Sequence, residues 1–133
     1  MTRYLLDTNI ISDLVRNPAG PATQRLLEVG DENICTSIIV ASELRYGCAK
    51  KGSAKLQERV EEVLAVIPVL ALEAPADVEY GTIRAELERR GQPIGHNDLL
   101  IAAHARMLGT TLVTANVGEF SRVEALKVEN WLE

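Results

Sequence analysis

Several common features are scarce or missing in this sequence of 133 residues. It has only two cysteines, Cys35 and Cys48, both in apolar surroundings, which favours buried free thiols over a disulfide framework. The N-terminus shows no signal-peptide pattern. The longest apolar run, residues 63–74, is interrupted by Pro68 and is too short to span a bilayer. These absences predict a cytoplasmic protein with no membrane partner.

The sequence also lacks a basic surplus. It has 14 Lys and Arg against 19 Asp and Glu, a net charge of −5, which argues against a broad coat of nucleic acid but leaves room for a local basic patch. No glycine-rich phosphate loop, zinc-ligand cluster or nucleophile–base triad is present. No repeat or Gly/Ser linker divides the chain, and its length suits one domain with a real core. We therefore expect a single domain over residues 1–133.

Strand-like and helix-like segments alternate along the chain. The patterns predict strands at residues 4–6, 33–36, 68–72 and 111–115, with a short last one within 127–131. They predict helices at about 10–16, 21–29, 38–50 after a Ser37 cap, 54–66 after a Ser53 cap, and from Pro75 as first residue to Gly91, followed by a buried helix that Asp98 opens. Such alternation indicates an α/β fold with a mainly parallel sheet covered by helices on both faces. Ligands bind such sheets at the carboxyl ends of the strands.

Two aspartates stand at the starts of predicted helices. Asp7 directly follows the first strand, in "LLDTN", where it is either a turn residue or a functional group. Because Asn9 can cap the next helix, Asp7 is not needed as a cap. Asp98 precedes an almost wholly apolar run, in "IGHNDLLIAAHARMLG". Taken alone, a helix N-cap is the simpler interpretation of Asp98.

A third acid, Glu43, lies within a helix, in "TSIIVASELRYG". At 100° per residue its neighbours on the helix surface are Ile39, Val40, Tyr46 and Gly47, which form an apolar stripe, while Ala41 and Arg45 point the other way. A glutamate on a buried stripe is costly unless it is paired or holds a metal. A buried ion pair with an arginine remains the alternative.

Taken together, the three acids predict one pocket. Carboxylates brought close together repel one another unless a cation lies among them, and hard oxygen ligands suit Mg²⁺ or Mn²⁺. Asn116 follows the fourth strand as Asp7 follows the first, so it is a candidate for a metal contact or a strand-end turn. Glu119, three residues later, is a further candidate. The residues alone thus predict a divalent-metal site at a sheet edge.

Four segments of this sequence together resemble those of a known protein family. "LLDTNIISDLV", "SELRYG", "IRAELERRGQPIGHNDLLIAAHARMLGTTLVTANVGEF" and "RVEALKVENW" span nearly the whole chain. In this combination and order they resemble the VapC-like PIN-domain ribonucleases, toxins of bacterial toxin–antitoxin pairs. The sequence is most similar to the subgroup that cuts initiator tRNA in the anticodon loop. Two departures are Asn116, where the family has an acid, and His96-Asn97, where Pro-Phe is more usual.

The resemblance implies a three-layer α/β/α sandwich and Mg²⁺-dependent RNA hydrolysis, with Mn²⁺ as a substitute. It maps the family's catalytic acids onto Asp7, Glu43 and Asp98, with Asn116 at the fourth position. Asp7 and Asp98 are then expected to hold the metal directly, Glu43 directly or through a water, and Asn116 to orient a water. The implied products have 5′-phosphate and 3′-hydroxyl ends. The implied partners are an RNA substrate, a VapB-type antitoxin, DNA only through that antitoxin, and a second copy in a homodimer.

An acidic pocket needs basic groups nearby to accept phosphates. Arg84, Arg89 and Arg90 flank the "GQPIGHND" loop, and Lys50, Lys51 and Lys55 form a second cluster, with a solvated helix face as the alternative for both. We name Arg84, Thr8 and Thr114 as candidate substrate contacts; strand-end capping is the alternative for the two threonines.

Two rival functions remain at this point. His96 and His104 could run a metal-free ribonuclease as an acid–base pair, although eight residues of helix would hold them about 12 Å apart. Alternatively, the chain is a catalytically silent PIN-like module that binds RNA or a protein, which Asn116 favours. Mn²⁺ titration distinguishes such a module from the metal-dependent enzyme.

Overall fold

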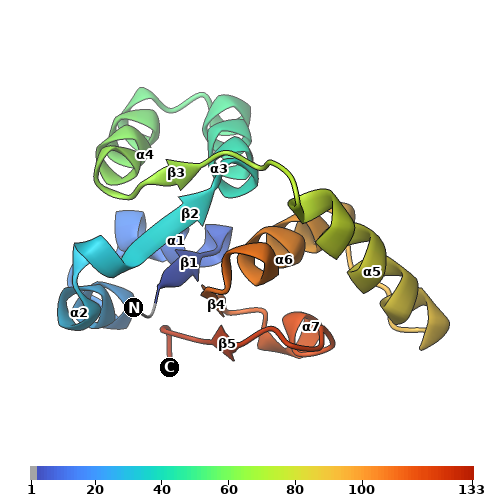
Figure 1. The fold of residues 1–133 in the computed structure, drawn as a ribbon. Coiled ribbons are helices and arrows are strands. Elements are labelled where there is room, and N and C mark those ends of the chain that lie inside the picture. The colour runs from blue at the N-terminus through green and yellow to red at the C-terminus, as the bar shows by residue number, and fades with distance from the viewer. Residues whose placement is uncertain (1–2) are drawn as a thin grey trace.

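The computed structural model describes residues 3–133, and its centre is a five-stranded sheet (Figure 1). The strands are β1 (Tyr4–Leu6), β2 (Ile34–Ser37), β3 (Val69–Leu70), β4 (Thr111–Val113) and β5 (Val128–Glu129). They lie in the order β3-β2-β1-β4-β5, and every neighbouring pair is parallel. The central strand β1 places Leu5 opposite Cys35 on one side and Leu112 on the other. The mainly parallel α/β sheet predicted from the sequence is therefore confirmed.

The helices form two groups about this sheet. They are α1 (Thr8–Arg16), α2 (Pro21–Val29), the short 3₁₀ turn η1 (Asp31–Asn33), α3 (Ile38–Lys51), α4 (Ala54–Val66), α5 (Ala76–Arg89), α6 (His96–Leu108) and α7 (Val117–Phe120). Helix α1 packs against α2, α3 and α4, whereas α5 packs chiefly on α6 (Figure 1). Parallel strands are almost always joined by right-handed crossovers. Because the chain runs from β1 to β2 to β3 in one direction, this rule assigns α1–α4 to one face and, on the return to β4, α5 and α6 to the other. Among the described residues, no helix has the length and apolar character of a membrane span.

Local sequence signals set several helix ends. The Ser37 hydroxyl accepts the Ile39 N–H at 3.1 Å and the Ser53 hydroxyl accepts the Leu56 N–H at 3.2 Å, as predicted for two N-caps. Gly52 and Gly109 end α3 and α6 in the left-handed conformation, which glycine adopts without a Cβ clash. These residues thus mark both ends of α3, the start of α4 and the end of α6.

Other boundaries differ from the predictions. Helix α1 begins at Thr8 rather than Ile10, because the Asp7 carboxylate itself caps it by accepting the Thr8 N–H at 2.8 Å; the assumption that Asn9 does so was wrong. Pro75 precedes α5 instead of being its first residue. Strand β3 is only Val69–Leu70, since it pairs with just Thr36 and Ser37 at the sheet edge. Helix α7 was not predicted.

The chain reverses its direction of travel across the sheet between β1 and β4. From β1 it moves outward to β2 and β3, and then returns to the opposite side of β1 to form β4. The Asp7 N–H donates to the Val113 carbonyl at 2.9 Å, which ties the ends of the two strands together. Leu5, Leu6 and Leu112 below this point are fully buried. A rigid core therefore supports the strand-end crevice where open α/β sheets bind ligands.

Candidate active site

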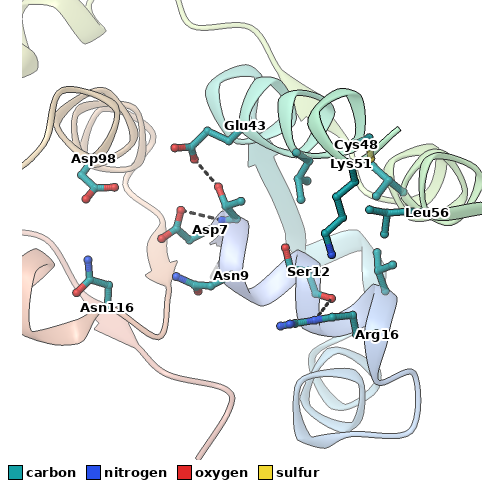
Figure 2. Close-up of a pocket in the computed structure, with 15 residues that line it drawn as sticks. Asp7, Asn9, Ser12, Arg16, Glu43, Cys48, Lys51, Leu56, Asp98 and Asn116 are labelled. Carbon is teal, nitrogen blue, oxygen red and sulfur yellow. Dashed lines mark hydrogen bonds between the residues drawn. The ribbon is translucent and has the colours of Figure 1, made fainter. Parts of the chain in front are cut away.

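A pocket of about 550 Å³ opens at these strand ends. Asp7, Glu43, Asp98 and Asn116 all line it (Figure 2). They come from the end of β1, the middle of α3, the start of α6 and the segment after β4. The sequence predicted that these side chains share one pocket, and the structure brings all four there.

Asp7 is the most firmly held of the acids. Only 4% of the residue is exposed, and its two carboxylate oxygens accept the Thr8 N–H and the Thr114 hydroxyl, each at 2.8 Å. Burial raises the pKa of Asp7 and the charge of Glu43 raises it further, against the lowering effect of those hydrogen bonds. The hydrogen bonds thus hold the carboxylate in place, while burial and the nearby like charge disfavour its ionised form.

Asp98 has a different setting. Helix α6 begins at His96 with Gly95 as its N-cap, so Asp98 is the third helical residue and the N-cap interpretation was wrong. Burial raises the pKa of Asp98 to about 6, assisted by the charges of Asp7, Glu119 and Glu43. A carboxylate that meets three others has a strong electrostatic reason to bind a cation.

Glu43 is half-buried at the border of the pocket. The Thr8 hydroxyl donates to one of its carboxylate oxygens, and Asn97 Nδ2 donates to the other at 3.2 Å. The predicted apolar stripe was wrong: Tyr46 is 66% exposed, and Ala41 is buried instead of pointing outward. The buried side of α3 consists of Val40, Ala41, Leu44 and Cys48. Glu43 lies beside this face because the helix meets the open pocket there, not another apolar surface.

A polar network holds the segment after β4. The Thr114 hydroxyl donates to Asp7 and accepts the Asn116 N–H at 3.0 Å. The Asn116 side-chain amide donates to the Glu119 carboxylate, and the Asn9 side-chain oxygen accepts the Ala115 N–H at 3.0 Å. Glu119 therefore lies beside Asn116, and its charge acts on Asp98. A carboxylate is thus present close to a position where the amide alone would be a weak metal ligand.

The three candidate substrate contacts differ in position. Thr8 lines the pocket. Thr114 has no exposed surface, so its hydroxyl orients Asp7 instead of reaching a ligand, which corrects the prediction of direct contact. Arg84 lies outside the pocket, where its guanidinium bonds Glu88 at 3.1 Å and the Tyr80 hydroxyl at 3.0 Å. Of these three candidates, only Thr8 lines the pocket.

The two histidines do not form an acid–base pair. His104 is fully buried, and its Nδ1 lies 2.8 Å from the Ser37 hydroxyl. His96 is exposed at the start of α6 and borders a separate hollow with Arg84. Neither lines the pocket of the acids, so the metal-free alternative built on this pair was wrong.

The pocket's donor set fits a hard divalent cation. No three His, Cys, Asp or Glu side chains within residues 3–133 already stand at metal-cluster spacing. Burial and neighbouring carboxylates nevertheless raise the pKa values of Asp7 and Asp98, and no Lys or Arg of that range forms a salt bridge with Asp7, Glu43 or Asp98. Mg²⁺ retains several waters and needs only one or two direct carboxylates. A looser set of acids therefore suits Mg²⁺ better than a tight cage would.

Comparison with known proteins identifies the family. Residues 4–126 match the PIN domain family. The chain belongs to the VapC ribonucleases of that family. Ribonuclease VapC2 of Haemophilus influenzae is 37% identical, over 99% of this chain and 100% of that protein. The tRNA(fMet)-specific endonuclease VapC of Shigella flexneri is also 37% identical, over 98% and 99%.

Solved structures agree with this assignment. The crystal structure of VapBC2 from Rickettsia felis, bound to a promoter DNA fragment, matches with a TM-score of 0.90 and 37% identity over 98% of this chain and 99% of that one. DNA-bound VapBC from Salmonella typhimurium matches with a TM-score of 0.88 and 34% identity, over 98% and 99%. The resemblance read from the motifs and the PIN fold it implied are confirmed.

Two residues that support the pocket of this PIN domain were not predicted from the sequence. Asn97 was noted only as a departure from a family pattern, yet it holds Glu43. Asn9 was expected to cap a helix, but it binds the segment after β4. Both are short polar residues within two positions of an expected acid. That proximity was a usable signal, although it does not specify which strand or helix such a side chain will meet.

Proposed function

We propose that this VapC-family chain hydrolyses phosphodiester bonds of tRNA with Mg²⁺ in the pocket of Asp7, Glu43, Asp98 and Asn116. The observation that carries the proposal is the convergence of unpaired carboxylates at the sheet's switch point. Initiator tRNA, cut in its anticodon loop, is the proposed substrate, because a full-length relative at 37% identity is named for tRNA(fMet). Mn²⁺ substitutes because it accepts the same oxygen ligands.

The proposed partners follow from the same relatives. The structural neighbours are VapBC complexes, so we assign this chain a VapB-type antitoxin that suppresses its activity. DNA is reached through that antitoxin, and the toxin itself pairs as a homodimer. We assign the protein to the cytoplasm, where its proposed tRNA substrate is found.

Each residue has a proposed part in catalysis. Asp7 and Asp98 would hold Mg²⁺ directly, and Glu43 would hold it directly or through a water molecule. When bound, Mg²⁺ supplies positive charge to the phosphate and makes water more acidic. Thr114 and Thr8 orient Asp7 and Glu43 by hydrogen bonds, and Asn97 fixes the second oxygen of Glu43. Asn116, anchored on Glu119, orients the attacking water toward the phosphate.

The test is cleavage of an initiator tRNA transcript by the purified full chain. We expect cuts in the anticodon loop with Mg²⁺ or Mn²⁺, products with 5′-phosphate and 3′-hydroxyl ends, and no cuts in EDTA or with Asp98→Asn. Cleavage that persists in EDTA and leaves cyclic phosphate ends would overturn the metal-dependent mechanism. A folded wild-type protein that binds Mn²⁺ but cuts other RNAs in preference to initiator tRNA would overturn only the proposed substrate.

A further inference from the structure

The pocket extends well beyond its acids. Away from Asp98 and Asn116 it continues between α1, α3 and α4, over the apolar side chains of Val15, Leu44, Cys48, Leu56 and Val60. Two cations, Arg16 and Lys51, line this extension. Figure 2 shows Lys51 reaching from α3 toward α1, on the side of the pocket opposite Asp98. The pocket therefore has an acidic end and a basic end.

Both cations lack an acidic partner in the described part of the chain. Arg16 donates from Nε to the Ser12 carbonyl at 3.4 Å, which leaves its other donors free, and no salt bridge includes Arg16 or Lys51. Some arginines elsewhere are paired with acids: Arg45 with Glu61, and Arg106 with Glu79. Positive charge in a protein of net charge −5 is thus left available inside one pocket.

The helices set the separation between the two ends. Arg16 lies eight residues after Thr8 on α1, and Lys51 lies eight residues after Glu43 on α3. Eight residues correspond to about 12 Å along a helix. Both cations are therefore too far from the acids to neutralise them or to share a phosphate held there, but they lie in the same continuous pocket.

We infer that Arg16 and Lys51 form a second phosphate subsite, which binds the RNA backbone some way along the strand from the phosphodiester bond that is cut. The inference rests on the proposed function, because it assumes that the cut phosphate lies at the acids. An RNA strand anchored there has to continue past the pocket walls. Unpaired Arg and Lys side chains donate hydrogen bonds readily to the oxygens of a backbone phosphate. The subsite also offsets the repulsion between RNA and the acidic pocket.

The test compares Arg16→Gln and Lys51→Gln with two matched controls in the full-length protein. Lys50→Gln removes the neighbouring charge in the same turn of α3, and Arg59→Gln removes an exposed charge of α4; neither lines the pocket. Cleavage is measured on anticodon-loop oligoribonucleotides shortened by one nucleotide at a time from either end. Binding to the same RNAs is measured by fluorescence anisotropy at several salt concentrations in an Asp98→Asn background.

We expect each pocket variant to raise KM and the RNA dissociation constant by roughly five- to tenfold, with kcat within about twofold of wild type. The salt dependence of log K should weaken by about 0.7 for each lost contact to a single strand. The effect should disappear once the RNA is too short to reach the subsite. Both control variants should behave like the wild type.

Three results would overturn the subsite. The pocket variants could match the controls in RNA affinity, their defect could persist unchanged on the shortest RNA, or they could lose only thermal stability, as expected if the cations merely complement helix C-termini. The first result would indicate instead that the basic end of the pocket binds an acidic protein segment. Absence of cleavage by the wild type would count against the proposed function alone, since the anisotropy arm still measures whether Arg16 and Lys51 bind RNA.

Discussion

Asp7 and Asp98 face the same pocket but are built into the fold in different ways. Asp7 is almost fully buried, caps α1 and accepts the Thr114 hydroxyl. Asp98 lies in the first turn of α6, where no backbone cap depends on it and its nearest charges are Asp7, Glu119 and Glu43. The Asp7 carboxylate therefore supports local structure as well as a metal. The Asp98 carboxylate repels its acidic neighbours unless a cation is bound.

The largest expected effect is on the rate of cleavage, and it should be similar for variants of the two aspartates. Asp7→Asn and Asp98→Asn should each lower the rate of tRNA cleavage by about 100-fold or more, because each removes a charge that holds Mg²⁺. Single-turnover rates at saturating Mg²⁺, with circular dichroism to verify the fold, measure this. A variant that retains more than a tenth of the wild-type rate would remove that aspartate from the proposed site.

Stability should separate them. Asp7→Ala leaves the Thr114 hydroxyl without an acceptor and α1 without its cap. We expect the free energy of unfolding to fall by about 2 kcal/mol, a net value because the variant no longer has to bury a charge. Asp98→Ala should stay within about 1 kcal/mol of the wild type, or exceed it, because repulsion is removed. Urea unfolding in EDTA gives both values. Equal losses would contradict the contrast between the two residues.

Asp98 should make the metal-free protein less stable as the pH rises. The folded-state pKa of Asp98 is raised from 3.8 to about 6, so between these values the folded chain binds more protons than the unfolded one. The contribution of Asp98 to stability is therefore fully present below pH 3.8, and it is lost as the pH rises to about 6. The raised pKa of Asp7 acts in the same direction.

This pH dependence is checked by urea midpoints in EDTA at pH 4.5 and 7. Between these two pH values the stability of the wild type should fall relative to that of Asp98→Asn. Stability that rises over this range equally in both proteins would show that Asp98 is not the group responsible.

The smallest effect is expected for Arg84→Gln. Arg84 lies outside the pocket and is occupied by Glu88 and Tyr80. Its removal should change kcat/KM for tRNA by less than about twofold, as is usual for exposed helix pairs. A tenfold or greater loss would restore Arg84 as a substrate contact and would place the RNA across α5.

The sequence predicted the acids better than their supports. Strand–helix alternation was enough to place Asp7 and Asn116 at strand ends and hence in one crevice. It did not reveal that Asp7 caps α1, because a helix start is decided by which side chain reaches the first N–H. Glu43 was predicted to be functional from a stripe that is partly exposed, since periodicity cannot tell a packed face from one that borders a pocket. Contacts such as Asn97 with Glu43 join residues 54 positions apart and are visible only in three dimensions.

The central claim is that these carboxylates form a divalent-cation site, and calorimetric titration with Mn²⁺ at pH 7 tests it most directly. Wild-type protein is titrated beside Asp98→Asn and beside Lys50→Gln, a charge change outside the pocket. We expect a saturable site in the wild type and in Lys50→Gln, and affinity at least tenfold weaker in Asp98→Asn, since a removed carboxylate weakens a site built from few such ligands. Mn²⁺ isotherms that are the same for all three proteins would contradict the account.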